Sequence, residues 1–334
     1  MSRRIPVFLF VSSFVLVSCR TNETDTLLSP GPMPLDPQSN SPRIMDLGTL
    51  GGLGSNAQAV NESGVVVGWS PITSGELHGF MWTEGEGMRD LGQGRALKVN
   101  DEGVVLLRRP DGYALWSASG TRPTGLSLAY SVSDMNNHGV LVGQTSDSRA
   151  FVWSAESGVT FLSSLGRGWS AAYAVNDHGV IAGYAATDLW HGPFLWEAAT
   201  GPTAIPFLPG AVTTLPVDIN EAGQVAGVAY YPRAYRAFRW SSTEGFVDVG
   251  AGMPASIDRS GNIIGTAESK NGGWSYAFYW TPATGMTNLH WLAQRPLSSF
   301  GHDMNDSGMI VGQSARFDVR KTGAQGHATL WRVR

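Results

Sequence analysis

Three aspartates occupy the same position in a sequence pattern that recurs along the chain, two residues before the Asn of an Asn-x-x-Gly tetrapeptide. They are Asp134, Asp218 and Asp303. Carboxylates that a fold brings together from separate segments can act as general acid and base, or can coordinate a cation. The structural alternative, which we favour, is that each carboxylate accepts hydrogen bonds from a neighbouring segment.

A second set of candidate residues lies where the repeated pattern is most variable, in segments expected to form loops. Aromatic rings and guanidinium groups there suit stacking on sugars, peptides or aromatic ligands. The candidate ligand-binding residues are Trp69, Arg108, Arg109, Trp169, Trp190, His191, Tyr231, Arg233, Tyr235, Trp274 and Tyr276. The alternative is that these side chains fold down and cover the edges of the sheets.

Other motifs give no support for a cofactor or a metal. Residues 52–57 (GLGSNA) fit the dinucleotide pattern G-x-G-x-x-A, but a turn and a hairpin follow where that site needs a helix. The sequence contains no H-E-x-x-H, P-loop, G-x-S-x-G or EF-hand motif. We therefore expect neither a cofactor nor a metal.

The candidate residues belong to seven internally repeated units. The clearest copy joins AYAVNDHGVIAGY (residues 172–184) to PFLWEAATG (residues 193–201). Turn residues 36 to 47 residues apart mark the units, a spacing typical of β-propeller blades: Asn61, Asn100, Asn136, Asn176, Asn220, Asp258 and Asn305. Each unit also contains a Trp: Trp82, Trp116, Trp153, Trp196, Trp240, Trp280 and Trp331. Because a residue repeated in every unit serves what every unit needs, we interpret these residues as structural.

Each unit predicts four short strands. The Asn opens a type I turn and the Gly supplies a positive φ, so the first two strands form a hairpin. An apolar run such as residues 140–143 (VLVG) indicates a second strand that is buried on both faces. A variable loop leads to a third strand that ends near the Trp, and a Gly then precedes a short fourth strand such as residues 246–250 (FVDVG).

The last unit ends three residues after Trp331 and has no fourth strand of its own. Residues 44–48 (IMDLG) match the fourth-strand pattern and precede the first unit. Pairing of this segment with the strand around Trp331 closes a ring and leaves no free sheet edge. We therefore predict an all-β fold, a seven-bladed β-propeller with four-stranded blades over residues 44–334, closed by its N-terminal strand.

The repeat resembles the HAF-repeat family of bacterial extracellular proteins, named for a His-Ala-Phe in the third strand. Residues 46–52 (DLGTLGG) reproduce the segment Asp-Leu-Gly-x-Leu-Gly-Gly that is typical of this family. The His-Ala-Phe signature is degraded and reads HGF (78–80), RAF (149–151 and 236–238), YAF (276–278) and HAT (327–329). The resemblance covers nearly all of the repeated region and implies a secreted propeller, without implying an activity.

The first 43 residues are expected to be processing and linker sequence. Arg3 and Arg4 precede an apolar run over residues 5–17 that suits a signal peptide and is too short for a membrane span. Residues 16–19 (LVSC) resemble the bacterial lipobox, which implies removal of residues 1–18 and acylation of Cys19. Residues 19–43 are then a Pro-rich tether. Because Arg20 follows Cys19, the resemblance implies a lipid-anchored protein of the outer membrane or cell surface; an ordinary signal peptide is the alternative.

Composition and charge limit the possible partners. The chain has 23 Lys and Arg against 27 Asp and Glu, a net charge of −4, and its basic residues are scattered, so we expect no nucleic-acid partner. Two functions remain. One is a monomeric, non-enzymatic recognition module that binds a glycan or a protein through its variable loop face. The other is a secreted hydrolase or lyase that uses Asp134, Asp218 and Asp303 at the central channel. We favour the first, because the three acids fall in the third, fifth and seventh blades and no nucleophile and base pair is visible.

Overall fold

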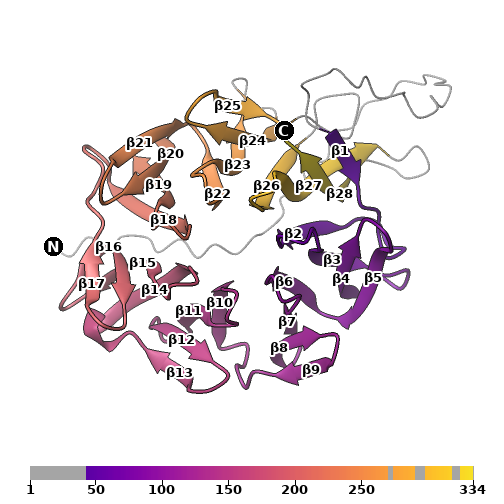
Figure 1. Ribbon diagram of the computed structural model, residues 1–334, viewed down its shortest axis with the longest axis horizontal. Helices are drawn as coiled ribbons and strands as arrows, with labels where there is room; N and C mark the ends of the chain where they lie inside the picture. Colours follow the sequence, from indigo (N-terminus) through magenta and orange to yellow (C-terminus); the bar gives the residue numbers. More distant parts are fainter. Residues whose placement is uncertain (1–42, 270–273, 290–297, 318–323, 334) are drawn as a thin grey trace. The chain divides into compact units, whose positions relative to one another are not determined.

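The structure is a computed structural model that describes residues 43–269, 274–289, 298–317 and 324–333. The predicted signal peptide and nearly all of the predicted tether lie outside these ranges. The described residues form seven four-stranded antiparallel sheets, arranged as blades around a common axis (Figure 1). This arrangement confirms the predicted seven-bladed β-propeller. No helix that is long and apolar enough to cross a membrane occurs among the described residues.

The first four blades follow one another along the chain, each with its strands in sequence order. Blade 1 comprises β2 (Asn56–Val60), β3 (Val66–Pro71), β4 (Leu77–Thr83) and β5 (Gly87–Gln93). Blade 2 comprises β6 (Arg95–Val99), β7 (Val105–Arg109), β8 (Gly112–Ser117) and β9 (Gly120–Pro123). Blade 3 comprises β10 (Tyr130–Met135), β11 (Leu141–Thr145), β12 (Ala150–Ser154) and β13 (Gly158–Phe161). Blade 4 comprises β14 (Gly168–Val175), β15 (Ile181–Thr187), β16 (His191–Glu197) and β17 (Gly201–Ala204).

The remaining three blades complete the ring. Blade 5 comprises β18 (Thr213–Ile219), β19 (Val225–Tyr231), β20 (Ala234–Ser241) and β21 (Gly245–Gly250). Blade 6 comprises β22 (Met253–Ile257), β23 (Ile263–Glu268), β24 (Ser275–Thr281) and β25 (Gly285–Asn288). Blade 7 comprises β26 (Ser299–Met304), β27 (Met309–Phe317), β28 (Ala324–Arg332) and, from the other end of the chain, β1 (Arg43–Asp46). A 3-10 turn at Ser163–Leu165 joins blades 3 and 4.

Strand β1 closes the ring. It pairs antiparallel with β28, so that Ile44 lies opposite Trp331 and Asp46 lies opposite Thr329. Trp331 is completely buried. The sequence predicts this closure, although the strand begins and ends slightly earlier than the expected residues 44–48.

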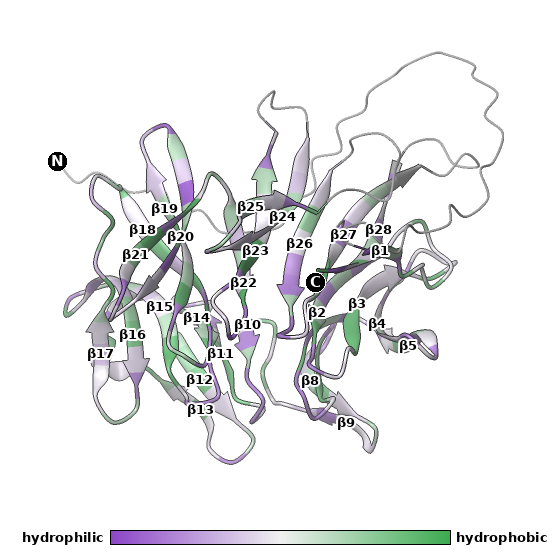
Figure 2. Cartoon of the chain, turned by 45° about the horizontal axis from the view of Figure 1, so that its top comes forward, coloured by the Kyte–Doolittle hydropathy of each residue, from purple (hydrophilic) through white to green (hydrophobic). Residues whose placement is uncertain are grey.

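The first strand of each blade lies nearest the axis and contacts the first strands of both neighbouring blades (Figure 1). In all seven first strands the register shifts by one residue just before the turn, at a β-bulge. Figure 2 shows hydrophobic residues concentrated along the strands and hydrophilic stretches on β10 and β26. The bulges therefore place polar residues of the inner strands close to the axis.

The blade core explains the repeated Gly of the second strand and the repeated Phe of the third. In blade 4, a Cβ on Gly183 would overlap the carbonyl oxygen of Ala171 and the ring of Phe194. Phe194 is fully buried over this Gly. In blade 2 the large residue lies in the second strand and the small residue in the third. Leu107 replaces the Gly, and its partner in the third strand is Ala114. The exchange conserves core volume, which cores tolerate well.

The Asp-Leu-Gly segments form a turn with a side-chain cap. The carboxylate of Asp46 accepts the backbone N–H of Gly48 at 2.9 Å, and that of Asp90 accepts the N–H of Gly92 at 2.7 Å. The same carboxylates contact the first residue of the degraded His-Ala-Phe signature, since His78 Nδ1 lies 2.9 Å from Asp90. His327 Nδ1 likewise lies 3.0 Å from Asp46. The two sequence signatures are thus partners in one structural unit.

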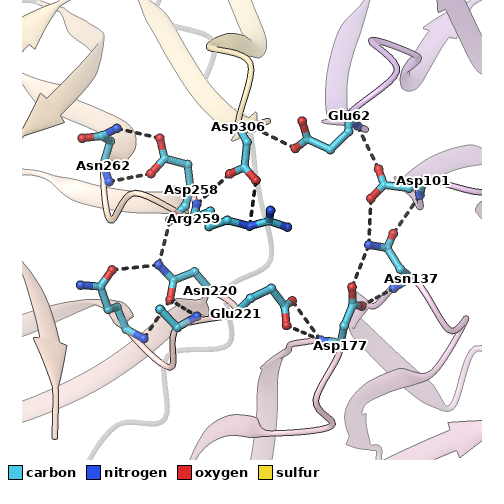
Figure 3. A network of polar contacts seen from close by, with 12 residues as sticks. Glu62, Asp101, Asn137, Asp177, Asn220, Glu221, Asp258, Arg259, Asn262 and Asp306 are labelled. Carbon is cyan, nitrogen blue, oxygen red and sulfur yellow. Dashed lines mark hydrogen bonds and ion pairs between the residues drawn. The ribbon is translucent and has the colours of Figure 1, made fainter.

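The hairpin turns are joined around the axis by two circles of hydrogen bonds, each interrupted once at blade 6, where Asp258 and Arg259 replace the Asn and the acceptor that follows it. In the first circle, the turn Asn donates its amide to a backbone carbonyl of the next blade, as Asn176 does to Asn220 at 3.1 Å. In the second circle, the residue after the turn Asn accepts the backbone N–H of the preceding blade, as Asp101 does from Glu62 at 2.9 Å (Figure 3). Because every described turn takes part in at least one circle, the repeated Asn residues are structural.

Candidate functional site

A buried ionic cluster lies near the axis, at the position two residues before each turn Asn. Lys98 Nζ lies 2.7 Å from a carboxylate oxygen of Asp134. Asp218 and Asp303 occupy the same position in blades 5 and 7, and both interact electrostatically with Lys98. The side chain of Lys98 keeps 33% of its surface exposed, whereas that of Asp134 keeps 11%. We call these four residues the axial cluster.

Each aspartate of the axial cluster also holds the next blade in place. Asp134 accepts the backbone N–H of Val175 at 2.9 Å, and Asp303 accepts that of Val60 at 3.0 Å. One oxygen of Asp218 accepts the N–H of Ile257 at 2.9 Å. Its other oxygen accepts the neighbouring N–H of Ile219 at 2.8 Å. These bonds join consecutive blades, so the carboxylates have a structural role whether or not they also do chemistry.

The electrostatics of the axial cluster are unusual. Burial lowers the pKa of Lys98, but the charges of Asp134, Asp303 and Asp218 outweigh this effect and hold the pKa above its ordinary value. Burial, followed by the charge of Asp134, raises the pKa of Asp218 to about 7. Burial also raises the pKa of Asp303. Asp218 and Asp303 thus keep their protons to higher pH than ordinary aspartates do.

The loop end of the ring is marked by seven cross-strand pairs that differ from blade to blade. Each pair joins the first and second strands at the same register position, on the far side of the bulge from the turn. We call them the variable pairs: Asn56 with Trp69, Arg95 with Arg108, Ser131 with Gln144, Ala171 with Tyr184, Leu215 with Val228, Met253 with Thr266, and Phe300 with Gln313. The rest of the blade repeats more closely than these pairs do, although some of their side chains are buried, among them Ala171, Val228 and Gln313.

Aromatic side chains gather at the loop end of blades 4 and 5. The tyrosine cluster comprises Tyr173, Tyr184, Tyr230 and Tyr235, with Trp169 and His191 beside them. The ring centroid of Tyr184 lies 5.9 Å from that of Trp169 and 6.2 Å from that of His191. Burial raises the pKa of Tyr173, and the proximity of Tyr184 and Tyr230 raises it further. Edge-to-face packing of this kind is a favourable arrangement of aromatic rings.

A basic pocket lies at the loop end of blades 1 and 2. It has a volume of about 320 Å³, and Arg95, Arg108 and Arg109 line it. The guanidinium carbon of Arg95 lies 4.8 Å from the ring centroid of Trp69. Burial, and then the charge of Arg108, lowers the pKa of Arg95. The loop end therefore combines a basic side with an aromatic side.

The structure places most of the predicted ligand-binding residues in strands, which corrects their assignment to loops. Trp69 lies in β3, Arg108 and Arg109 in β7, Trp169 in β14, His191 in β16, Tyr231 in β19, Tyr235 in β20 and Tyr276 in β24. Trp190, Arg233 and Trp274 lie between strands. The ladders extend further toward the loop end than the apolar pattern indicates, because their outermost residues are polar or aromatic.

The predicted tryptophans are half-buried rather than exposed. Trp190 packs against the core of blade 4, and its indole N–H donates to the carbonyl of Gly192 at 3.2 Å. Trp69 is covered by Arg95, and Trp169 packs against Tyr184. Arg108, His191 and Arg233 are exposed. The sequence pattern did not single out Arg95, Tyr173 and Tyr184, whose positions beside these residues depend on the bulged register.

Other parts of the described chain offer weaker sites. Residues 52–57 lead into strand β2, as expected, and not into a helix. A hollow of about 580 Å³ lies at the turn end of blades 2 and 3 and is lined partly by repeated turn residues such as Asn100 and Gly139. Among the described residues, no three His, Cys, Asp or Glu side chains are grouped as the ligands of a metal ion would be.

Fold and site together define a seven-bladed β-propeller whose loop end carries the blade-specific side chains. No protein-family model matches the chain, and no curated protein matches it. Solved structures do match in fold. A streptogramin B lyase is 10% identical with a TM-score of 0.58, covering 88% of this chain and 98% of its own.

Two further solved structures show the same likeness. An oligogalacturonate lyase from Vibrio parahaemolyticus is 10% identical with a TM-score of 0.60, covering 87% of this chain and 93% of its own. A virginiamycin B lyase from Staphylococcus aureus is 8% identical with a TM-score of 0.55, covering 88% of this chain and all of its own. At these identities the likeness shows the fold alone.

Proposed function

We propose that this protein is a recognition module that binds a glycan through the loop end of its propeller. The observation that carries the proposal is the contrast between the two ends of one repeat. The turn end repeats nearly the same hydrogen bonds in every blade, whereas the variable pairs at the loop end differ in every blade. Packing of similar blades requires the residues that repeat at the turn end, whereas recognition of a ligand requires residues that vary, as those at the loop end do.

The chemistry of the loop end suits a sugar. The tyrosine cluster offers aromatic faces for the C–H surface of a pyranose ring and hydroxyl groups for its hydroxyls. The arginines of blade 2 supply hydrogen-bond donors. Solved propellers of the same fold are named as lyases of streptogramin B, virginiamycin B and oligogalacturonate, so the scaffold accommodates ligands that include an oligosaccharide.

The test is binding of the purified protein to an array of glycans and peptides, with variants matched to the protein's own repeat. Tyr184→Val places at the variable pair of blade 4 the residue that stands in blade 5 (Val228). We expect this change to weaken glycan binding about tenfold and to leave the melting temperature within about 2 °C. Tyr279→Val is the matched control, because Val152 holds the equivalent position of β12.

Three results would count against the proposal. Selective binding to peptides would replace the glycan with a protein ligand. Equal losses from Tyr184→Val and Tyr279→Val would remove the loop end as the site. Consumption of a bound glycan would favour the hydrolase or lyase alternative, and Asp218→Asn would then be the variant to compare.

We further propose that the propeller is anchored to the cell surface by a lipid on Cys19. The Pro-rich tether holds the propeller away from the bilayer surface and leaves it free to reorient. Cys19→Ala is expected to abolish lipid labelling and to move the protein out of the membrane fraction. Unchanged fractionation of the variant would favour an ordinary signal peptide.

A further inference from the structure

The basic pocket of blade 2 contains two arginines whose placement the fold does not explain. Arg95 and Arg108 form the variable pair of this blade, so their side chains start from directly opposite positions on β6 and β7. In other blades the same pair is Ser131 with Gln144, or Leu215 with Val228. Since those blades have the same topology, no structural requirement of the propeller places two cations here.

The equivalent glutamines show what the position does when its role is structural. Gln144 donates its amide to the carbonyl of Ser170 in the next blade at 2.8 Å. Gln313 likewise donates to the carbonyl of Ser55 at 2.9 Å. Within the described part of the chain, Arg108 has neither this hydrogen bond nor an acidic partner, and it is exposed. The position has therefore exchanged an inter-blade bond for a guanidinium group that is available to a ligand.

The charges around the pocket are not balanced. Three arginines line it, together with the single carboxylate of Glu76. Arg109 has a partner 3.6 Å away in Asp111, but in the described ranges Arg95 and Arg108 have no acidic partner. Arg95 is half-buried and covers Trp69, and its charge lies near that of Arg108. Like charges at a partly buried site repel each other, and an anion between them removes the repulsion.

The remainder of the pocket wall consists of Gln93, Gly94 and three apolar residues. Leu77, Pro110 and Leu128 line it, and Leu128 keeps 46% of its surface exposed. A pocket of about 320 Å³ is at the small end of the range for ligand sites and holds roughly one or two sugar units. The protein as a whole carries a net charge of −4, so long-range attraction does not explain anion binding and local recognition must supply it.

We propose that this pocket is a subsite for a uronic-acid unit of an acidic oligosaccharide. The carboxylate accepts hydrogen bonds from Arg95 and Arg108, whose planar guanidinium groups match a carboxylate in geometry. The C–H face of the sugar lies against Leu77 and Leu128. The subsite rests on the proposed glycan-binding function and assigns it a ligand class.

The experiment measures calorimetric binding of the full chain to oligogalacturonate, with its methyl ester as a neutral probe of the same shape. The key variant is Arg95→Ser combined with Arg108→Gln, which gives blade 2 the pair already present in blade 3. Arg122→Gln, at the exposed strand β9, is the charge control. We expect the double variant to bind the acid at least about thirtyfold more weakly, to melt at nearly the wild-type temperature, and to match the wild type with the ester.

Each other outcome overturns the subsite, and the outcomes separate it from the proposed function. If the wild type binds acid and ester equally, glycan recognition stands but no carboxylate subsite exists. If the double variant and Arg122→Gln lose the same affinity, the effect is one of net charge. If dextran sulfate or polyglutamate binds and oligogalacturonate does not, the pocket is selective for sulfate or for an acidic peptide. Should the double variant unfold, Arg108→Gln alone is compared, with an expected loss of about tenfold.

Discussion

At the scale of single residues, the axial cluster combines a structural role with an unusual titration. Lys98 neutralises Asp134 directly, while Asp218 and Asp303 remain near the axis without a lysine of their own in the described chain. Their hydrogen bonds to the next blade favour the charged form, and burial favours the neutral form. Burial prevails, so the pKa of both aspartates is raised, that of Asp218 to about 7.

This titration predicts that stability decreases as pH rises. Between about pH 4 and pH 7 the folded protein retains the proton of Asp218, which the unfolded chain has already released, so the free energy of unfolding falls across this range. Asp303 acts in the same direction. We expect the free energy of unfolding to be about 1–2 kcal/mol lower at pH 8 than at pH 5. The raised pKa of Asp218 alone would give a larger difference, but solvent screens this partly exposed carboxyl group.

Chemical denaturation at the two pH values tests this expectation. In Asp218→Asn the difference between pH 5 and pH 8 should shrink, whereas the exposed-site control Asp147→Asn should keep it. An identical pH profile for Asp218→Asn and the wild type would show that Asp218 titrates normally. The test compares the change in the free energy of unfolding between the two pH values, because Asp218→Asn alters one backbone hydrogen bond at both pH 5 and pH 8.

A second residue-scale prediction concerns the turn of blade 6, the one turn that has Asp in place of Asn. Asp258 accepts hydrogen bonds from Asn262 at 2.8 Å but, as a carboxylate, cannot donate to the next blade as Asn220 does. Asp258→Asn should add the missing link to Asn305 and raise the free energy of unfolding by about 0.5–1.5 kcal/mol. Denaturant titration measures the gain, and Asn220→Asp should cause a similar loss. A destabilised Asp258→Asn would show that the Asp suits its own turn better.

At the scale of elements, the short strand β1 stabilises a blade from the opposite end of the chain. Without it, β28 becomes an open edge and Trp331 loses its contact with Ile44. Deletion of residues 1–46 should therefore lower the melting temperature of the whole propeller by at least about 5 °C relative to deletion of residues 1–42. Scanning calorimetry compares the two proteins, and a peptide of residues 43–48 should restore part of the loss. Equal melting temperatures would mean that β28 needs no partner.

The strands and turns show which parts of the fold and of the candidate site could be predicted from the sequence. The repeat predicts seven blades and the closing strand, because Asn-x-x-Gly turns and paired Gly and Phe residues follow from local sterics. The same repeat could not show the β-bulge at Tyr173, which leaves no compositional signal. It also could not show that Arg95 lies opposite Arg108, since register depends on that bulge. The candidate site was therefore only partly predictable.

At the scale of the whole molecule, the propeller separates its tasks between its two ends. Two circles of hydrogen bonds join the blades at the turn end (Figure 3). This connection leaves the variable pairs at the other end free to differ, with arginines in blade 2 and tyrosines in blades 4 and 5. In the proposed function, these positions present several chemistries to one ligand.

Closure by β1 also sets the order of events during biosynthesis. The ribosome makes β1 first and its partner β28 last, so the ring stays open until almost the entire chain has been synthesised. Until then both the β1 strand and the growing edge blade expose unpaired backbone groups. A truncated chain can form its early blades but cannot complete the circle. Quality control that recognises open sheet edges would therefore distinguish a finished molecule from an interrupted one by this single four-residue strand.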